Sequence, residues 1–68
     1  MELRKGKYYI VRYDKDDGRS EFLNIETGEF VLALRDATAF DTKYMAMPYH
    51  AKFNNDKHYN YTIRFYDN

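Results

Sequence analysis

The sequence predicts an α+β fold, in which a small, mainly antiparallel four-stranded sheet carries one irregular helical segment on one face. Two runs near the ends of the 68-residue chain are rich in Tyr, Ile and Val, as is typical of strands. Glycine-containing turn signals divide the first half of the chain at short intervals. Between residues 36 and 55 the apolar residues change to a helical period. The predicted element order is therefore β-β-β-α-β.

The first strand is expected over residues 7–13. Alternation places Tyr9 and Val11 on one side of this strand and Tyr8 and Ile10 on the other. Both sides are partly apolar, so the pattern leaves open which of them faces the core.

A turn rich in aspartate follows, with Asp14, Asp16 and Asp17 before Gly18. A calcium-binding loop has a similar composition, but it requires Gly at its sixth position and Glu at its twelfth. Counted from Asp14, Gly18 is the fifth residue and Ile25 the twelfth. The spacing therefore predicts a solvated hairpin turn and no metal site.

The second and third strands are expected over residues 21–26 and 29–34. Gly28, at the junction, suits the left-handed position of a tight turn. Together with the first strand they form a three-stranded meander. The expected apolar side of the third strand is made of Phe30, Leu32 and Leu34.

Four apolar residues of the helical segment recur at spacings that place them on one side of a helix, and we expect this stripe to seal the sheet. Its members are Phe40, Tyr44, Met47 and Ala51. Asp41 or Thr42 can cap the start of the helix, and Asn54-Asn55 marks its end. Pro48 lacks a backbone donor, so we expect either a kinked helix or a second short helix that begins at Pro48.

The final strand is expected over residues 58–66, with Tyr61 and Ile63 on one side and Thr62 and Arg64 on the other. It joins an outer edge of the meander, beside either the first or the third strand. If direction alternates through the meander and the helix, the final strand runs parallel to either neighbour.

Composition predicts a single domain over residues 1–68, with residues 1–6 as a basic lead-in. The chain has no Cys, and hence no disulfide or thiolate metal site. Eleven Lys and Arg balance eleven Asp and Glu, which disfavours duplex DNA as a partner because phosphate neutralisation normally needs a basic protein. No apolar run is long enough to cross a membrane, and no secretion signal is present, so we expect no membrane partner and a protein that stays inside the cell.

Two segments of the chain, together with its opening strand, resemble the sequences of a known group of proteins. Residues 22–30 read Phe-Leu-Asn-Ile-Glu-Thr-Gly-Glu-Phe, and residues 37–42 read Ala-Thr-Ala-Phe-Asp-Thr before the helix. With the opening Tyr-Tyr-Ile strand, this order resembles small uncharacterised accessory proteins of phages and prophages of Gram-positive bacteria. Pro48 departs from the pattern, because such proteins usually carry uninterrupted helix formers there.

The resemblance implies a phage origin and an accessory role in the cytoplasm of the bacterial host. Small phage proteins of this kind often block a host enzyme or a defence complex, such as a CRISPR effector. The resemblance carries no catalytic residue with it.

Catalytic residues are not indicated by the sequence either. His50 and His58 do not have the spacing of a zinc pair. His50 with Asp41 or Glu29 can imitate a general base and its orienting carboxylate, but no nucleophile accompanies them. We therefore expect no enzyme, no metal and no cofactor.

Aromatic and arginine residues are the candidate binding residues. If the first and last strands are neighbours, one exposed patch is expected from Tyr8, Arg12, Arg64 and Tyr66. Met45 and Tyr49 lie off the helical stripe and are secondary candidates. Such a surface suits a protein partner, and alternatively the stacking of single-stranded nucleic acid or a nucleotide. The third interpretation is that these rings simply cover the second face of a thin domain.

The functional hypothesis is a non-enzymatic interaction module that binds a host protein and inhibits or redirects it by steric occlusion. The excess of rings over what so small a core requires motivates it: eight Tyr and five Phe in 68 residues. Pairing of an exposed edge strand with its copy also predicts a homodimer.

Overall fold

The computed structural model describes residues 6–67 and confirms the α+β class and the order β-β-β-α-β. The basic lead-in, apart from Gly6, lies outside the described residues. A short 3-10 helix, η1, adds to the predicted elements. Their bounds are β1 Lys7–Asp14, β2 Ser20–Asn24, β3 Glu29–Val31, η1 Leu34–Asp36, α1 Lys43–His50 and β4 Tyr59–Tyr66.

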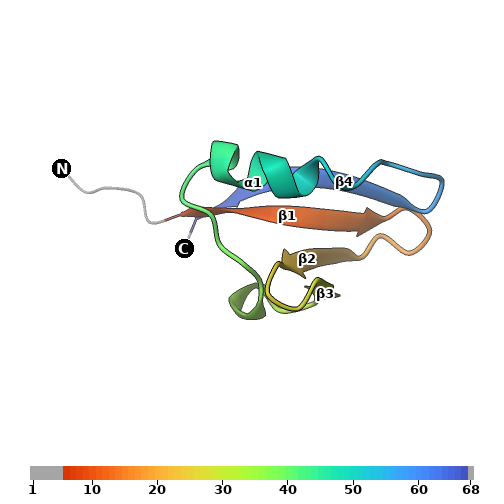
Figure 1. Ribbon diagram of the computed structural model, residues 1–68. Coiled ribbons are helices and arrows are strands. Elements are labelled where there is room, and N and C mark those ends of the chain that lie inside the picture. The colour runs from red at the N-terminus through yellow and green to blue at the C-terminus, as the bar shows by residue number, and fades with distance from the viewer. Residues whose placement is uncertain (1–5, 68) are drawn as a thin grey trace.

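The four strands form one sheet in the order β3-β2-β1-β4, and every neighbouring pair is antiparallel. The last strand therefore joins the meander beside β1, one of the two edges that the sequence allowed (Figure 1). The parallel direction expected for it is wrong. β4 pairs with the whole of β1, from Lys7 opposite Tyr66 to Asp14 opposite Tyr59.

An additional extended pass explains the reversed direction. After η1 the chain runs past the start of β1 before it reaches α1 (Figure 1). There the Thr38 N–H donates to the Leu23 carbonyl at 3.0 Å, and Phe40 and Tyr8 exchange two backbone bonds of 2.8 and 2.9 Å in an antiparallel bridge. Residues 38–40 thus act as one more antiparallel pass, which reverses the chain once more than the strand count predicted.

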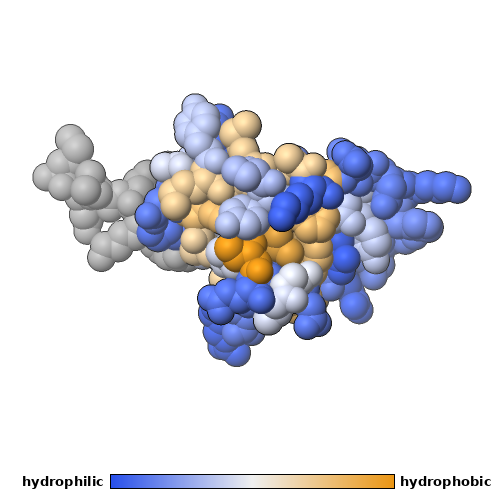
Figure 2. Space-filling view, viewed as in Figure 1, coloured by the Kyte–Doolittle hydropathy of each residue, from blue (hydrophilic) through white to orange (hydrophobic). Residues whose placement is uncertain are grey.

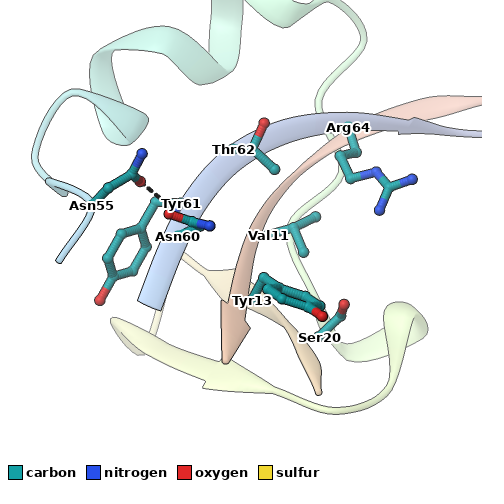
Figure 3. A pocket seen from close by; sticks show the side chains of 8 residues that line it. All are labelled: Val11, Tyr13, Ser20, Asn55, Asn60, Tyr61, Thr62 and Arg64. Carbon is teal, nitrogen blue, oxygen red and sulfur yellow. Dashed lines mark hydrogen bonds between the residues drawn. The ribbon is translucent and has the colours of Figure 1, made fainter. Parts of the chain in front are cut away.

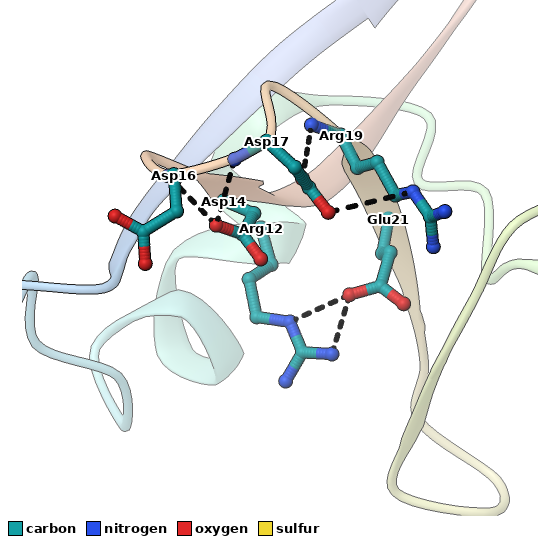
Figure 4. A network of polar contacts seen from close by, with 6 residues as sticks. All are labelled: Arg12, Asp14, Asp16, Asp17, Arg19 and Glu21. Atoms are coloured by element: carbon teal, nitrogen blue, oxygen red, sulfur yellow. Dashed lines mark hydrogen bonds and ion pairs between the residues drawn. The ribbon is translucent and has the colours of Figure 1, made fainter.

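Both predicted turns are confirmed. Gly18 and Gly28 have φ values of 77° and 76°, in the left-handed region that Gly adopts without strain. In the first turn the Asp14 carboxylate accepts from the backbone N–H groups of Asp16 and Asp17 (Figure 4). The aspartates therefore organise a hairpin turn, as side chains of this type do.

The third strand is shorter than predicted, because it ends at Val31 and not at residue 34. Leu32 is exposed and Leu34 begins η1, so the apolar side expected from alternation does not exist beyond Phe30. The chain must turn back here to bring Phe40 beside Tyr8. The 3-10 bonds that make this turn run from the Asp36 N–H to Ala33 and from the Ala37 N–H to Leu34.

The main core lies between α1 and the sheet, and we call this side of the sheet the helix face. Ile10, Leu23, Phe40 and Ala46 are buried there, and Ile10 and Ala46 have no exposed surface. Figure 1 shows α1 lying along β1 and β4, the two strands that it contacts.

The helical stripe expected to seal the sheet is wrong for three of its four members. Phe40 is buried, but Tyr44, Met47 and Ala51 are exposed, and the buried residue of α1 is Ala46. The spacing was counted from Phe40, which lies in the extended pass before the helix. The small Ala46 side chain lets α1 approach the sheet, and this contact sets which side of the helix is buried.

Capping and proline fix the limits of α1. The Thr42 hydroxyl accepts from the Met45 N–H at 3.3 Å, so Thr42, one of the two predicted caps, begins the helix. The helix ends at His50, before the predicted stop at Asn54. Pro48 lies inside it, so α1 is one short helix and no second helix begins there. No helix in the described residues is long and apolar enough to cross a membrane.

The side of the sheet opposite α1, which we call the distal face, has a small aromatic cluster of its own. Tyr9, Phe22 and Tyr66 meet edge to face with ring centroids 5.6–6.4 Å apart. Val11 is buried beside them. Such pairs add about 0.5–1.5 kcal/mol beyond burial. Both sides of β1 are therefore packed, which is why its pattern was apolar on both.

The outer edge of β4 is partly covered by the loop that precedes it. The Tyr61 N–H donates to the Asn55 side chain at 2.7 Å, and His50 Nε2 bonds the Tyr61 carbonyl at 2.9 Å. At Tyr59 the backbone N–H donates to the Asp56 carboxylate, and the Tyr59 carbonyl accepts from the Asp56 N–H. Side chains and turn geometry thus satisfy backbone groups of Tyr59 and Tyr61 that an edge strand normally leaves open.

Asp56 gives this loop a measurable pH dependence. Backbone N–H groups of Tyr59 and His58 donate to its carboxylate, which lowers the pKa of Asp56 below its ordinary value. A lowered pKa in the folded state adds stability above the unfolded-state pKa, and this contribution is lost as pH falls through the folded-state pKa. We expect the loop to loosen below about pH 4. A carboxyl titration by NMR measures the pKa. Asp56→Asn keeps the acceptor oxygen without the charge, so its stability should lack this acid step, and an unshifted Asp56 pKa would contradict the assignment.

Candidate functional site

The four residues expected to form one exposed patch lie on opposite faces of the sheet. Tyr8 and Arg12 are on the helix face, whereas Arg64 and Tyr66 are on the distal face, because β1 and β4 pair Tyr8 with Phe65 and Arg12 with Tyr61. The first and last strands are neighbours, as the patch required. The pairing register of β1 and β4, which the sequence does not reveal, places the two residues of β1 on one face and the two residues of β4 on the other.

Arg12 is held in a structural network on the helix face. Its Nε and Nη2 atoms donate to one oxygen of Glu21 at 3.1 and 2.5 Å (Figure 4). The guanidinium carbon lies 4.3 Å from the ring centroid of Phe30 and 4.5 Å from that of Tyr59. Burial opposes the charge, but the hydrogen bond and charge of Glu21 hold the pKa of Arg12 above its ordinary value. Arg12 therefore joins β1, β2, β3 and β4.

Tyr8 and Tyr49 also pack against the core. The Tyr8 ring meets the Phe65 ring edge to face at 5.1 Å, and the Tyr49 ring lies 5.6 Å from that of Phe40. Both tyrosines are half-buried against the buried cluster. Of the helical candidates, only Met45 is largely exposed.

The exposed side of α1 carries three large apolar side chains, two of which, Tyr44 and Met47, were expected in the core. Tyr44, Met45 and Met47 are 71%, 52% and 51% exposed, and we call these three residues the helix ridge. Figure 2 shows apolar residues gathered over α1 and between α1 and the β2–β3 hairpin. A surface helix normally presents polar residues to solvent. The helix ridge therefore departs from the usual pattern.

A small pocket opens beside α1, on the same face. It has a volume of about 150 Å³ and lies between the end of α1 and the β2–β3 hairpin. Its lining is apolar except for the Lys52 side chain, which lies over the Tyr49 ring at 5.7 Å. The lining residues are Leu23, Ile25, Gly28, Tyr49, Lys52 and Phe53.

The distal face carries a larger, shallow depression of about 620 Å³ (Figure 3). The buried Val11 lies between Tyr13, a residue that is 42% exposed, and the exposed Arg64. Polar groups complete the surface. The lining residues are Val11, Tyr13, Ser20, Asn55, Asn60, Tyr61, Thr62 and Arg64.

Arg64 has a different environment from Arg12. Its guanidinium lies 5.8 Å from the ring centroid of Tyr66, and it forms no ion pair with any of residues 6–67. Among the described residues, no carboxylate lines the depression. The distal depression therefore combines an exposed ring with a cation whose charge is not neutralised locally.

His50 and His58 have different partners. His50 bonds the Tyr61 carbonyl and not Asp41 or Glu29, while Asp41 pairs with Lys7. His58 is exposed, with its Nδ1 atom 3.7 Å from Asp16. Within residues 6–67 no group of three or more His, Asp or Glu side chains is arranged to hold a metal ion.

Tyr44 and Tyr13 are exposed, which the sequence did not predict. Tyr44 was placed in the core because helical spacing was counted from Phe40, and Tyr13 was not singled out because it continues the apolar side of β1. The position of Tyr13, two residues beyond Val11 and next to the turn, was the available signal for exposure at a strand end.

Comparison with known proteins gives no relative for this chain. No family model matches it, and neither a curated protein nor a solved structure matches it. Function must therefore be argued from the surfaces themselves.

Proposed function

We propose that the chain is a non-enzymatic interaction module that binds another protein through the helix ridge and inhibits or redirects it by steric occlusion. The observation that carries this proposal is the composition of α1. One of its eight residues, Ala46, is buried, while Tyr44, Met45 and Met47 are each more than half exposed. The helix thus presents three large apolar side chains to solvent, while the one residue that it buries completely is a small one.

Exposed apolar surface of this kind favours association. Burying it gains roughly 25 cal/mol for each Å² removed from water. Tyr and Met are enriched at the centre of protein interfaces, and the flexible Met side chain adapts to irregular partners. The neighbouring 150 Å³ pocket can accept an apolar side chain of the partner.

Charge adds a second requirement for the partner. Residues 42–55, which contain α1 and the turn after it, include Lys43 and Lys52 but no Asp or Glu. An interface centred on the helix ridge is therefore rimmed by cations. A partner with an apolar centre and acidic residues around it complements this surface, which favours encounter and orientation.

The resemblance to phage accessory proteins supports a particular class of partner. It points to a protein of a Gram-positive bacterial host, in the host cytoplasm, and to a defence complex or a host enzyme as the target. A small module that covers a functional surface of such a target needs no catalytic residue of its own.

The helix ridge can be tested by comparing variants in a pull-down from the lysate of a Gram-positive bacterium. We expect a partner retained by the natural chain to be lost with Tyr44→Ser/Met47→Ser. Truncating central interface residues typically costs 2 kcal/mol or more, about 30-fold in Kd for each. Titration of the purified partner by calorimetry gives the magnitude.

A matched control is provided by Tyr13→Ser, which removes an exposed ring from the distal face. Both variants change exposed residues, so both should keep their thermal midpoints within a few degrees. The proposal is contradicted if Tyr44→Ser/Met47→Ser still retains the partner and Tyr13→Ser does not.

A further inference from the structure

Most of the distal depression is formed by side chains of β1 and β4 that point to the distal face. Tyr13 lies opposite Asn60 in the β1–β4 register, and Arg64 lies four residues farther along β4. Because a strand rises by about 3.3 Å per residue, the Cα atoms of Tyr13 and Arg64 are about 13 Å apart along the sheet. Thr62, opposite Val11, lies between them (Figure 3).

The two ends of this depression have different chemistry. At one end Tyr13 is 42% exposed and pairs with no other ring among the described residues, so part of its surface is available to a base. At the other end the Arg64 guanidinium has no ion-pair partner in residues 6–67. Ser20 and Asn60 flank Tyr13 on the two neighbouring strands, and the Thr62 hydroxyl lies between the two ends.

We infer that the distal depression binds an aromatic base with an attached phosphate, the unit that single-stranded nucleic acid and free nucleotides share. Tyr13 stacks on the base and Arg64 binds the phosphate. Ser20 and Asn60, beside Tyr13, meet the base edge, and Thr62, between the two ends, meets the sugar. A base, its sugar and its phosphate span most of the separation between the two residues. The flexible stem of Arg64 covers the rest.

Charge complementarity selects this occupant over an apolar one. The only charged side chain that lines the depression within residues 6–67 is Arg64, so the site is locally cationic in a chain of zero net charge. The exposed part of the floor is small because Val11 is 1% exposed. Stacking and one phosphate contact, rather than apolar burial, must therefore supply the affinity.

This inference does not rest on the proposed protein-binding function. The helix ridge and the distal depression lie on opposite sides of the sheet, so each can be removed without changing the other. The pair Tyr44 and Tyr13 provides one exposed ring on each side.

NMR titration of the full chain tests the site, with short oligo(dT), AMP and inorganic phosphate as separate probes at low salt. We expect oligo(dT) or AMP to shift the amide signals of β1 and β4 around Val11 and Thr62, and inorganic phosphate alone to leave them unshifted. Tyr13→Ala should weaken binding about fivefold or more. The slope of log K against log salt should be about −0.7, as for one phosphate contact with a single strand.

Arg64→Ala separates phosphate binding from stacking. It should weaken binding and remove most of the salt dependence, whereas Tyr44→Ser/Met47→Ser should bind as the natural chain does. Tighter binding of oligo(dT) than of AMP identifies single-stranded nucleic acid as the ligand, and the reverse identifies a free nucleotide. No shift with either probe, or binding unchanged in both Tyr13→Ala and Arg64→Ala while both remain folded, overturns the inference.

Discussion

Phe40→Ala is expected to remove most of the stability of this protein. The Phe40 ring is buried against Tyr49, and its backbone forms the bridge to Tyr8 that closes the extended pass. Truncating a buried Phe costs about 3–5 kcal/mol. At roughly 0.05–0.15 kcal/mol per residue, a chain of 68 residues has only about 3–10 kcal/mol in total. We expect the thermal midpoint to fall by on the order of 20 °C.

Circular dichroism melting measures this effect, and Leu32→Ala is the control. Leu32 is 65% exposed, in the same connection between β3 and α1, so its truncation should change the free energy of unfolding by less than about 0.5 kcal/mol. Equal losses in the two variants would mean that Phe40 does not hold α1 on the sheet.

Arg12→Met is expected to cause the second large loss of stability. Met keeps an apolar stem of similar length, so the variant isolates the guanidinium. The loss includes the two bonds to Glu21 and the contacts with the rings of Phe30 and Tyr59. Bonds to charged groups contribute about 1.5–3 kcal/mol and each ring contact about 0.5–1 kcal/mol. Because these terms overlap, we expect a net loss of about 2–3 kcal/mol in chemical denaturation.

Two comparisons make this test specific. A double-mutant cycle with Glu21→Gln should give a coupling energy of about 1 kcal/mol, since the two residues share one network. Arg64→Met places the same substitution on the neighbouring strand, at a guanidinium without an ion pair in the described residues, and should cost less than about 0.5 kcal/mol. Similar losses at both arginines would show that Arg12 is not a special structural residue.

The strands and turns of this fold follow from local patterns, which is why the sequence predicts them well. Alternating aromatic and β-branched residues define β1 and β4, and glycines with positive φ define the hairpin turns. The direction of β4 depends instead on residues 38–40. An extended pass of three residues leaves no periodic pattern, and it forms only because Tyr8 and Leu23 offer backbone partners.

The candidate site is less predictable than the fold, because it depends on register and on which side of α1 is buried. Sequence alternation correctly separates the two sides of each strand, but it cannot say which side of β1 lies with which side of β4. Arg12 and Arg64 were therefore assigned to one patch, although one is enclosed by rings and the other is exposed. The buried side of α1 is set by a single small residue, Ala46, which hydrophobic spacing does not mark.

The partly covered edge of β4 affects how the protein associates at high concentration. A strand from a second copy that added beside Tyr59 and Tyr61 would have to displace Asn55, His50 and Asp56 from the backbone groups that they already bond. Each new bond would replace an existing one of about 0.5–1.5 kcal/mol, so the exchange would yield almost no net gain. We therefore expect this stretch of β4 to contribute little to the edge-paired homodimer predicted from the sequence, and to resist the strand addition by which tyrosine-rich chains grow into fibrils.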